Sequence, residues 1–217
     1  MFPGFGARSN RTRGLGAAVF PVLAAILLAC GGGGVGWAPG GLRGVPLIPP
    51  VPEPDFTLIA TDGRPYSFKP ETHGALALLF FGYTHCPDVC PVNLATLAAA
   101  LRDLPLEVSR RVRVVFVTVD PARDSAPRLR AWLDTFDPAF VGLRGPPADV
   151  NRIETRLNLT PAVVERLPDS SYRVGHAAAV IALISDSARF LYPFGTRRVD
   201  WLHDLPKLVA QLPGGDR

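Results

Sequence analysis

The feature that most constrains the fold is an unbroken apolar run from Ala75 to Phe81. A strand that is apolar at every position, rather than at every second one, is typical of a central strand covered on both faces. The run leads into Gly82 and a segment with two cysteines, and residues 92–103 then carry leucine and alanine at helical spacing. A buried strand that is followed by a loop and a helix predicts an α/β sheet.

The rest of the domain continues this alternation. Two short strands at 56–59 and 66–68 flank the turn dipeptide Asp62-Gly63, which predicts an N-terminal β-hairpin. Further expected elements are a valine-rich strand at 113–119, helices at 126–136 and 148–157 with a short strand near Phe140 between them, a hairpin formed by 174–184 and 189–192, and a last helix at 199–212. This order predicts an open α/β fold of the thioredoxin kind, with a central sheet flanked by helices.

The first thirty residues have the composition of an export signal. Three arginines occur before Gly14, no charged residue occurs from Gly14 to Leu42, and residues 17–29 form an apolar core. Leu-Leu-Ala-Cys at 27–30 resembles a bacterial lipoprotein signal, which predicts a signal peptide at 1–30 and a lipid anchor on Cys30. An uncleaved membrane helix is the alternative, although four glycines at 31–34 disfavour a helix.

Both kinds of anchor predict a domain held at the extracytoplasmic face of a cell membrane. Residues 31–52 are rich in Gly and Pro without periodicity, so we expect a linker there and a folded domain at 53–217. The formal net charge is +4, and Arg8, Arg11 and Arg13 account for three of these charges. The remainder is too close to neutral to indicate nucleic acid binding.

Cys86 and Cys90 occupy the segment between the central strand and its helix. Pro91 suits the first helical position, which would make Cys90 the N-cap and leave Cys86 in the loop. Both sulfurs would then lie near the positive end of a helix, where the thiolate is favoured over the thiol. The pair therefore indicates redox or metal chemistry, with a structural disulfide as the alternative in an exported protein.

Three segments of the chain resemble the SCO/SenC family of copper chaperones for cytochrome oxidase. They are FFGYTHCPDVCP at 80–91, TVDPARD at 118–124 and YRVGH at 172–176. The resemblance covers about residues 53–212 and implies that Cys86, Cys90 and His176 bind one copper ion per chain. Two soft thiolates and an imidazole suit Cu(I) and can accept Cu(II). Three ligands also leave one side of the metal open to a partner.

The resemblance implies a binding protein rather than an enzyme. Such a protein takes copper from a donor that the sequence does not identify and passes it to the binuclear copper site of cytochrome c oxidase subunit II. The alternative is a thiol-disulfide oxidoreductase, in which Cys86 and Cys90 keep the oxidase's own copper-binding cysteines reduced. Thioredoxin-like reductases generally use a shorter CxxC spacing, so the CxxxC spacing and the histidine favour metal binding.

The surroundings of His176 depart from the family pattern. Family members commonly have an acidic residue before the histidine and a hydroxyl residue after it, whereas Gly175 and Ala177 stand here. The departure concerns hydrogen bonds around the ligand rather than its identity.

The sequence predicts less about the other polar residues near these motifs. His85 is not expected to be a fourth ligand, because adjacent residues in an extended loop point apart. Asp120 and Arg123 follow a buried strand, at the sheet edge where sites form, with a turn or capping role as the alternative.

Overall fold

The computed structural model describes residues 41–168 and 171–213, which belong to one compact unit. The strands are β1 Val45–Pro52, β2 Thr57–Ala60, β3 Pro65–Ser67, β4 Leu76–Gly82, β5 Val112–Thr118, β6 Val141–Arg144, β7 Val163–Arg166, β8 Tyr172–Gly175, β9 Val180–Ile184 and β10 Ser187–Tyr192. The helices are α1 Phe68–Thr72, α2 Val89–Asp103, α3 Leu106–Ser109, α4 Ala126–Asp134, α5 Pro147–Arg156 and α6 Arg198–Val209.

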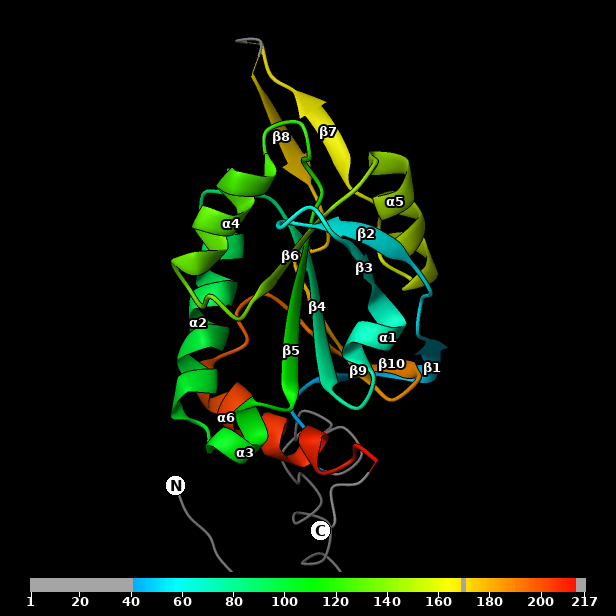
Figure 1. Ribbon diagram of the computed structural model, residues 1–217, viewed down its shortest axis with the longest axis vertical. Coiled ribbons are helices and arrows are strands. Elements are labelled where there is room, and N and C mark those ends of the chain that lie inside the picture. The colour runs from blue at the N-terminus through cyan, green and yellow to red at the C-terminus, as the bar shows by residue number, and fades with distance from the viewer. Residues whose placement is uncertain (1–40, 169–170, 214–217) are drawn as a thin grey trace, which may run out of the picture. The chain divides into compact units, whose positions relative to one another are not determined.

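Eight of the strands form one mixed sheet in the order β1-β10-β9-β4-β5-β6-β2-β3. In Figure 1, α2 and α4 lie on one side of β4 and β5, and α1 and α5 lie on the other. Strand β4 pairs in parallel with β5 and antiparallel with β9, and every one of its residues is buried. The prediction of an α/β fold with a central sheet between helices is therefore confirmed.

The sheet begins earlier in the chain than the sequence predicted. Residues 45–52 form an edge strand that pairs antiparallel with β10, and Leu42 is buried. The expectation of a linker as far as residue 52 and a domain from residue 53 is therefore wrong for 41–52. The prolines of this segment hid the strand, because proline is tolerated on an edge strand, where the missing N–H can face solvent.

Interactions with the C-terminal helix hold this early segment in place. The buried carboxylate of Asp204 accepts hydrogen bonds from the backbone N–H groups of Arg43 and Gly44, at 2.7 and 3.0 Å. Residues 1–40, which include Cys30 and the predicted signal peptide, lie outside the described residues. Among the described residues, no helix is long and apolar enough to cross a membrane.

A second hairpin interrupts the predicted strand at 174–184. Strands β7 and β8 pair with each other in a separate two-stranded sheet, and β9 starts only at Val180. Figure 1 shows the β7–β8 hairpin projecting beyond the end of the main sheet. The residues between β8 and β9 begin with His176, so the hairpin determines where this side chain lies.

Candidate metal centre

The structure brings Cys86, Cys90 and His176 together, although the histidine is far from the cysteines in sequence. Their ligand atoms all lie within 4.8 Å of one another. Cys86 comes from the loop after β4, Cys90 from the first turn of α2, and His176 from the residue directly after β8. Both cysteines are free thiols, and Cys90 Sγ lies 3.5 Å from His176 Nε2.

Helix α2 starts earlier than the sequence predicted. Asp88 is the N-cap, and its side chain accepts a hydrogen bond of 2.7 Å from the backbone N–H of Val89. The prediction that Cys90 is the N-cap is therefore wrong. Proline is tolerated throughout the first turn, where backbone N–H groups have no helical partner, so Pro91 did not mark the exact start.

This helix start orients the two sulfurs differently. The backbone N–H of Cys90 donates to Cys86 Sγ at 3.4 Å, so Cys86 carries the sulfur that faces the helix N-terminus. The side chain of Cys90 also hydrogen-bonds Cys86, and this bond is the main reason that the pKa of Cys86 is lowered to about 5. Hydrogen bonds from the Cys90 amide and His176 lower this pKa further, whereas burial raises it. The bond between the two side chains and burial both raise the pKa of Cys90.

The lowered pKa of Cys86 and the raised pKa of Cys90 favour a thiolate at Cys86 and a thiol at Cys90 that donates to it, whereas the sequence predicted a stabilised thiolate at both positions. Because metal ligands must be deprotonated, metal binding would release the remaining proton from Cys90.

Gly82, at the end of β4, allows Cys90 to lie directly against the sheet. A Cβ atom at this position would come within 2.7 Å of Cys90 Sγ and 2.9 Å of the Phe116 ring. Sequence reasoning gave Gly82 no role. Its place between the apolar run and the cysteine segment was the available signal.

Asp124 holds the cysteine loop through hydrogen bonds to Thr84. It is completely buried and accepts hydrogen bonds from the Thr84 backbone N–H at 3.0 Å, the Thr84 hydroxyl at 2.6 Å and the Thr118 hydroxyl at 2.6 Å. His85 Nδ1 lies 3.8 Å from the same carboxylate and is not part of the three-residue cluster. The imidazole of His85 thus faces the carboxylate that supports the loop.

The ring of His176 is held by two aromatic edges and a backbone carbonyl. Its centroid lies 5.6 Å from that of Tyr83 and 6.4 Å from that of Phe80. His176 Nδ1 lies 3.1 Å from the carbonyl oxygen of Ala177. With its proton on Nδ1, the ring donates to this carbonyl and leaves the Nε2 lone pair free for a metal. A backbone group thus supplies the outer hydrogen bond that the Ala177 side chain cannot make.

The predicted residues at the sheet edge hold the hairpin. Arg123 donates to the carbonyl oxygen of Tyr172 at 3.1 Å, and its guanidinium carbon lies 3.8 Å from the centroid of the Tyr172 ring. Asp120 forms an ion pair with Arg123 and accepts a hydrogen bond of 2.9 Å from the Tyr172 hydroxyl. Asp120 and Arg123 therefore hold the start of the strand that leads to His176.

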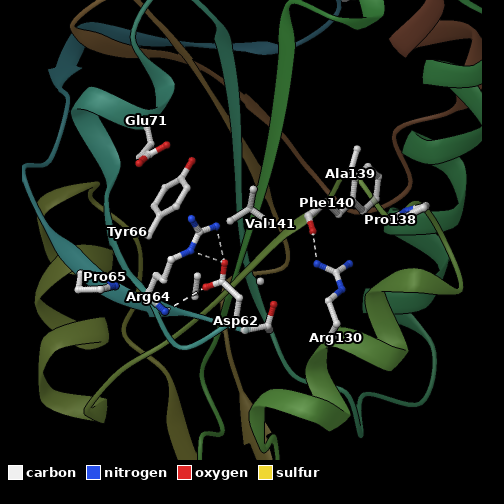
Figure 2. Close-up of a pocket in the computed structure, with 13 residues that line it drawn as sticks. Asp62, Arg64, Pro65, Tyr66, Glu71, Arg130, Pro138, Ala139, Phe140 and Val141 are labelled. Carbon is white, nitrogen blue, oxygen red and sulfur yellow. Dashed lines mark hydrogen bonds and ion pairs between the residues drawn. The ribbon is translucent and has the colours of Figure 1, made fainter.

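A separate pocket of about 450 Å³ lies where β2, β3 and β6 meet, and none of the three clustered side chains lines it. Figure 2 shows two of its polar interactions: Asp62 pairs with Arg64, and Arg130 donates to the carbonyl oxygen of Phe140. The candidate chemistry therefore lies at the Cys86, Cys90 and His176 cluster.

Comparison with known proteins relates the chain to the proteins that its motifs resemble. The family model described as SCO1/SenC matches residues 49–205. The SCO1 homolog 1 of Arabidopsis thaliana is 34% identical over 154 residues, which are 71% of this chain and 44% of that protein. A putative copper-binding protein of Stutzerimonas stutzeri is 32% identical over 57% of this chain and 60% of that protein. The chain thus spans about half the length of these curated relatives.

Solved structures give the same relationship. Apo Sco1 from Thermus thermophilus matches with a TM-score of 0.69 and 31% identity, over 77% of this chain and 96% of that one. Copper-bound ScoI from Bradyrhizobium japonicum matches with a TM-score of 0.64 and 29% identity, over 72% of this chain and 98% of that one. These matches confirm the predicted thioredoxin-like fold. By sequence and by structure, the chain belongs to the SCO1/SenC family.

Proposed function

We propose that this protein binds copper and delivers it to the binuclear copper site of cytochrome c oxidase subunit II during assembly of a respiratory oxidase. The observation that carries the proposal is the convergence of two cysteine sulfurs and one imidazole within 4.8 Å. The copper-bound ScoI structure of Bradyrhizobium japonicum, which is similar over 72% of this chain, supports copper as the metal.

The residues present fit a copper ion. Thiolate and imidazole ligands suit Cu(I), and the same set can hold Cu(II). Cys86 is a thiolate before any metal arrives, because its pKa is about 5. His176 presents Nε2 toward Cys90, which fixes the nitrogen that would bind. Copper held by these residues is the ion to be transferred, and it is the atom to which a partner's ligands would bind.

Transfer of the ion requires that a partner ligand can enter. Three protein ligands leave one position open, in contrast to the closed four-ligand arrangement of structural zinc sites. A cysteine of subunit II can then bind the ion before a ligand of this chain leaves. The proposed role is therefore ligand exchange, with no bond made or broken in an organic substrate.

Metal loading of the purified full chain tests this function. We expect one copper per chain and a sulfur-to-Cu(II) absorption band that Cys86→Ser, Cys90→Ser and His176→Ala each abolish. His85→Ala is the matched control and should keep the band, because its imidazole lies outside the cluster. Mixing the loaded chain with the copper-free soluble domain of subunit II should move copper to that domain. Stoichiometric zinc in place of copper would reject the proposal.

A thiol-disulfide oxidoreductase is the second candidate, although the copper-bound and copper-binding relatives favour copper binding over it. A thiolate at Cys86 beside a protonated Cys90 is the arrangement of an attacking and a resolving thiol. The two functions differ in their need for the histidine. If oxidase assembly in cells depends on both cysteines and proceeds normally with His176→Ala, reduction of the oxidase cysteines is the better account.

We also propose that the chain is anchored at the extracytoplasmic face of a cell membrane through a lipid on Cys30. The support is the sequence of residues 1–30, with its early arginines, its apolar core and the Leu-Leu-Ala-Cys segment. Growth with labelled palmitate should label the wild-type chain and leave Cys30→Ala unlabelled. Equal labelling of both chains would exclude the lipid.

A further inference from the structure

Glu154, on helix α5, is a buried acid that no sequence motif singled out. Its side chain is completely buried, and its Oε1 atom has no hydrogen-bond partner among the residues that the structure describes. Its Oε2 atom accepts a hydrogen bond of 3.0 Å from the backbone N–H of Ala162. Burial of a carboxyl group with one unpartnered oxygen is costly, so its presence calls for a local reason.

The Ala162 bond connects Glu154 to the base of the β7–β8 hairpin. Ala162 directly precedes Val163, and Val163 lies opposite Gly175 in the register of the two strands. His176 is the next residue after Gly175. Figure 1 shows α5 beside the base of β7. The hydrogen bond between Glu154 of α5 and Ala162 therefore fixes the start of β7. This end of β7 pairs with Gly175, the residue before His176.

The hairpin has a second anchor at the other strand. Arg123 and Asp120 hold Tyr172, which begins β8, whereas Glu154 holds the residue before β7. The turn between α5 and β7 is also tied back to the helix, since the backbone N–H of Leu159 donates to the Glu154 carbonyl oxygen at 2.9 Å. Each strand of the hairpin thus has its own polar connection to the main body of the domain.

The protonation of Glu154 agrees with this geometry. Burial raises the pKa of Glu154, while the hydrogen bond from the Ala162 N–H lowers it. These are the effects expected of a buried carboxyl group with one backbone donor.

We propose that Glu154 is a positioning residue for His176, which fixes the base of the hairpin through Ala162 and so holds the imidazole over the two cysteines. The proposal rests on the proposed copper function. It assigns to α5 a part in the metal centre, although α5 contributes no ligand.

Two substitutions separate positioning from a general contribution to folding. Glu154→Gln keeps an oxygen that can accept the Ala162 bond, whereas Glu154→Leu keeps the volume and removes the acceptor. Glu154→Leu removes a buried carboxyl group with an unpartnered oxygen and also leaves the Ala162 N–H without its acceptor. Because these two effects on stability oppose each other, Glu154→Leu should unfold near the wild-type temperature. Glu165→Gln is the matched control, since Glu165 lies on the same hairpin, is exposed and pairs only with Arg173 among the described residues.

The copper readout is affinity, measured by competition with a chelator, together with the sulfur-to-Cu(II) band of the full chain. We expect Glu154→Leu to bind copper about 10- to 100-fold more weakly with a shifted band, as is typical for loss of an outer partner of a metal ligand. Glu154→Gln and Glu165→Gln should resemble the wild type. Wild-type affinity and an unshifted band in Glu154→Leu would overturn the proposal, as would an equal loss in Glu154→Gln.

A second readout does not depend on copper. In the metal-free chain, Glu154→Leu should speed hydrogen exchange at the Ala162 amide and shift the imidazole resonances of His176, and Glu154→Gln should do neither. Unchanged exchange and resonances in Glu154→Leu would contradict the positioning role. If the wild type fails to bind copper, the proposed function fails, while these two measurements still decide the role of Glu154.

Discussion

The two halves of the candidate metal centre are built in different ways. The cysteine loop lies between the central strand and helix α2, where Cys90 is 0% exposed and Cys86 is 8% exposed. The histidine follows a hairpin outside the main sheet, whose strand β7 exposes Val163 and Val164 at 63% and 57%. Core packing fixes the sulfurs, whereas two aromatic rings, a backbone carbonyl and the polar contacts of the hairpin hold the imidazole. We therefore expect the sulfurs to decide whether copper binds and the histidine to adjust how tightly it is held.

The largest effect on copper affinity should come from substitution of Cys90, the fully buried sulfur ligand. Cys90→Ser replaces a soft sulfur with a hydroxyl group of similar shape, so the fold should persist while Cu(I) affinity falls by more than about 100-fold, beyond the loss from an outer partner. Chelator competition measures the affinity and circular dichroism checks the fold. Cys30→Ser is the matched control and should bind as the wild type does. Near-normal affinity in Cys90→Ser would contradict the claim that the two sulfurs decide whether copper binds.

His176→Ala should have a smaller effect on Cu(I). Both sulfurs remain, so we expect Cu(I) affinity to fall by about 100-fold, which is less than in Cys90→Ser and at least as much as in Glu154→Leu, since Glu154 acts through this ligand. Thermal unfolding of the metal-free chain should hardly change, because the ring is only partly buried. A loss as large as that of Cys90→Ser would show that the two halves contribute equally.

Asp124→Asn tests the support beneath the cysteine loop. The amide N–H₂ of asparagine would face donors that now bond to a carboxylate oxygen, so we expect a loss of about 1–3 kcal/mol in the free energy of unfolding. Urea unfolding measures it. Asp134→Asn, which breaks an exposed ion pair with Arg130, should cost less than about 1 kcal/mol. Equal losses in the two variants would contradict a special support by Asp124.

The smallest effect concerns only the protonation of Cys86. Since its folded pKa is about 5, the thiolate is present above this value and disappears as the pH falls through it. The alkylation rate of Cys86 by iodoacetamide, followed by mass spectrometry of its peptide, should be nearly constant from pH 8 to 6 and decline around pH 5. In Cys90→Ala, which removes the largest cause of the shift, the decline should move to higher pH. A wild-type midpoint near 8.5, the value of an ordinary cysteine, would contradict the proton arrangement.

Local patterns predicted the parts of the molecule that depend on neighbouring residues. The run at 75–81 is apolar because β4 is covered on both faces, and the two cysteines follow it directly. Position 176 was predicted as a ligand from a family resemblance, since a single histidine has no local signature. The structure brings it to the cysteines, and its metal role stays a prediction.

Features that depend on distant partners were missed. Strand β1 is defined by its pairing with β10, and its prolines conceal it from any local pattern. Strand β7 exposes all four of its residues, so it shows no alternation. Glu154 and Asp124 look like ordinary surface acids in the sequence. The fold shows that both are buried: Asp124 accepts hydrogen bonds from the cysteine loop, and Glu154 accepts one at the base of the hairpin that leads to His176.

X-ray absorption at the copper edge tests the central claim most directly. For the copper-loaded full chain, we predict two sulfur ligands and one imidazole nitrogen per copper, with the imidazole lost in His176→Ala and retained in His85→Ala. Coordination of wild-type copper by sulfur alone, or an imidazole that persists in His176→Ala, would contradict the joint site of Cys86, Cys90 and His176.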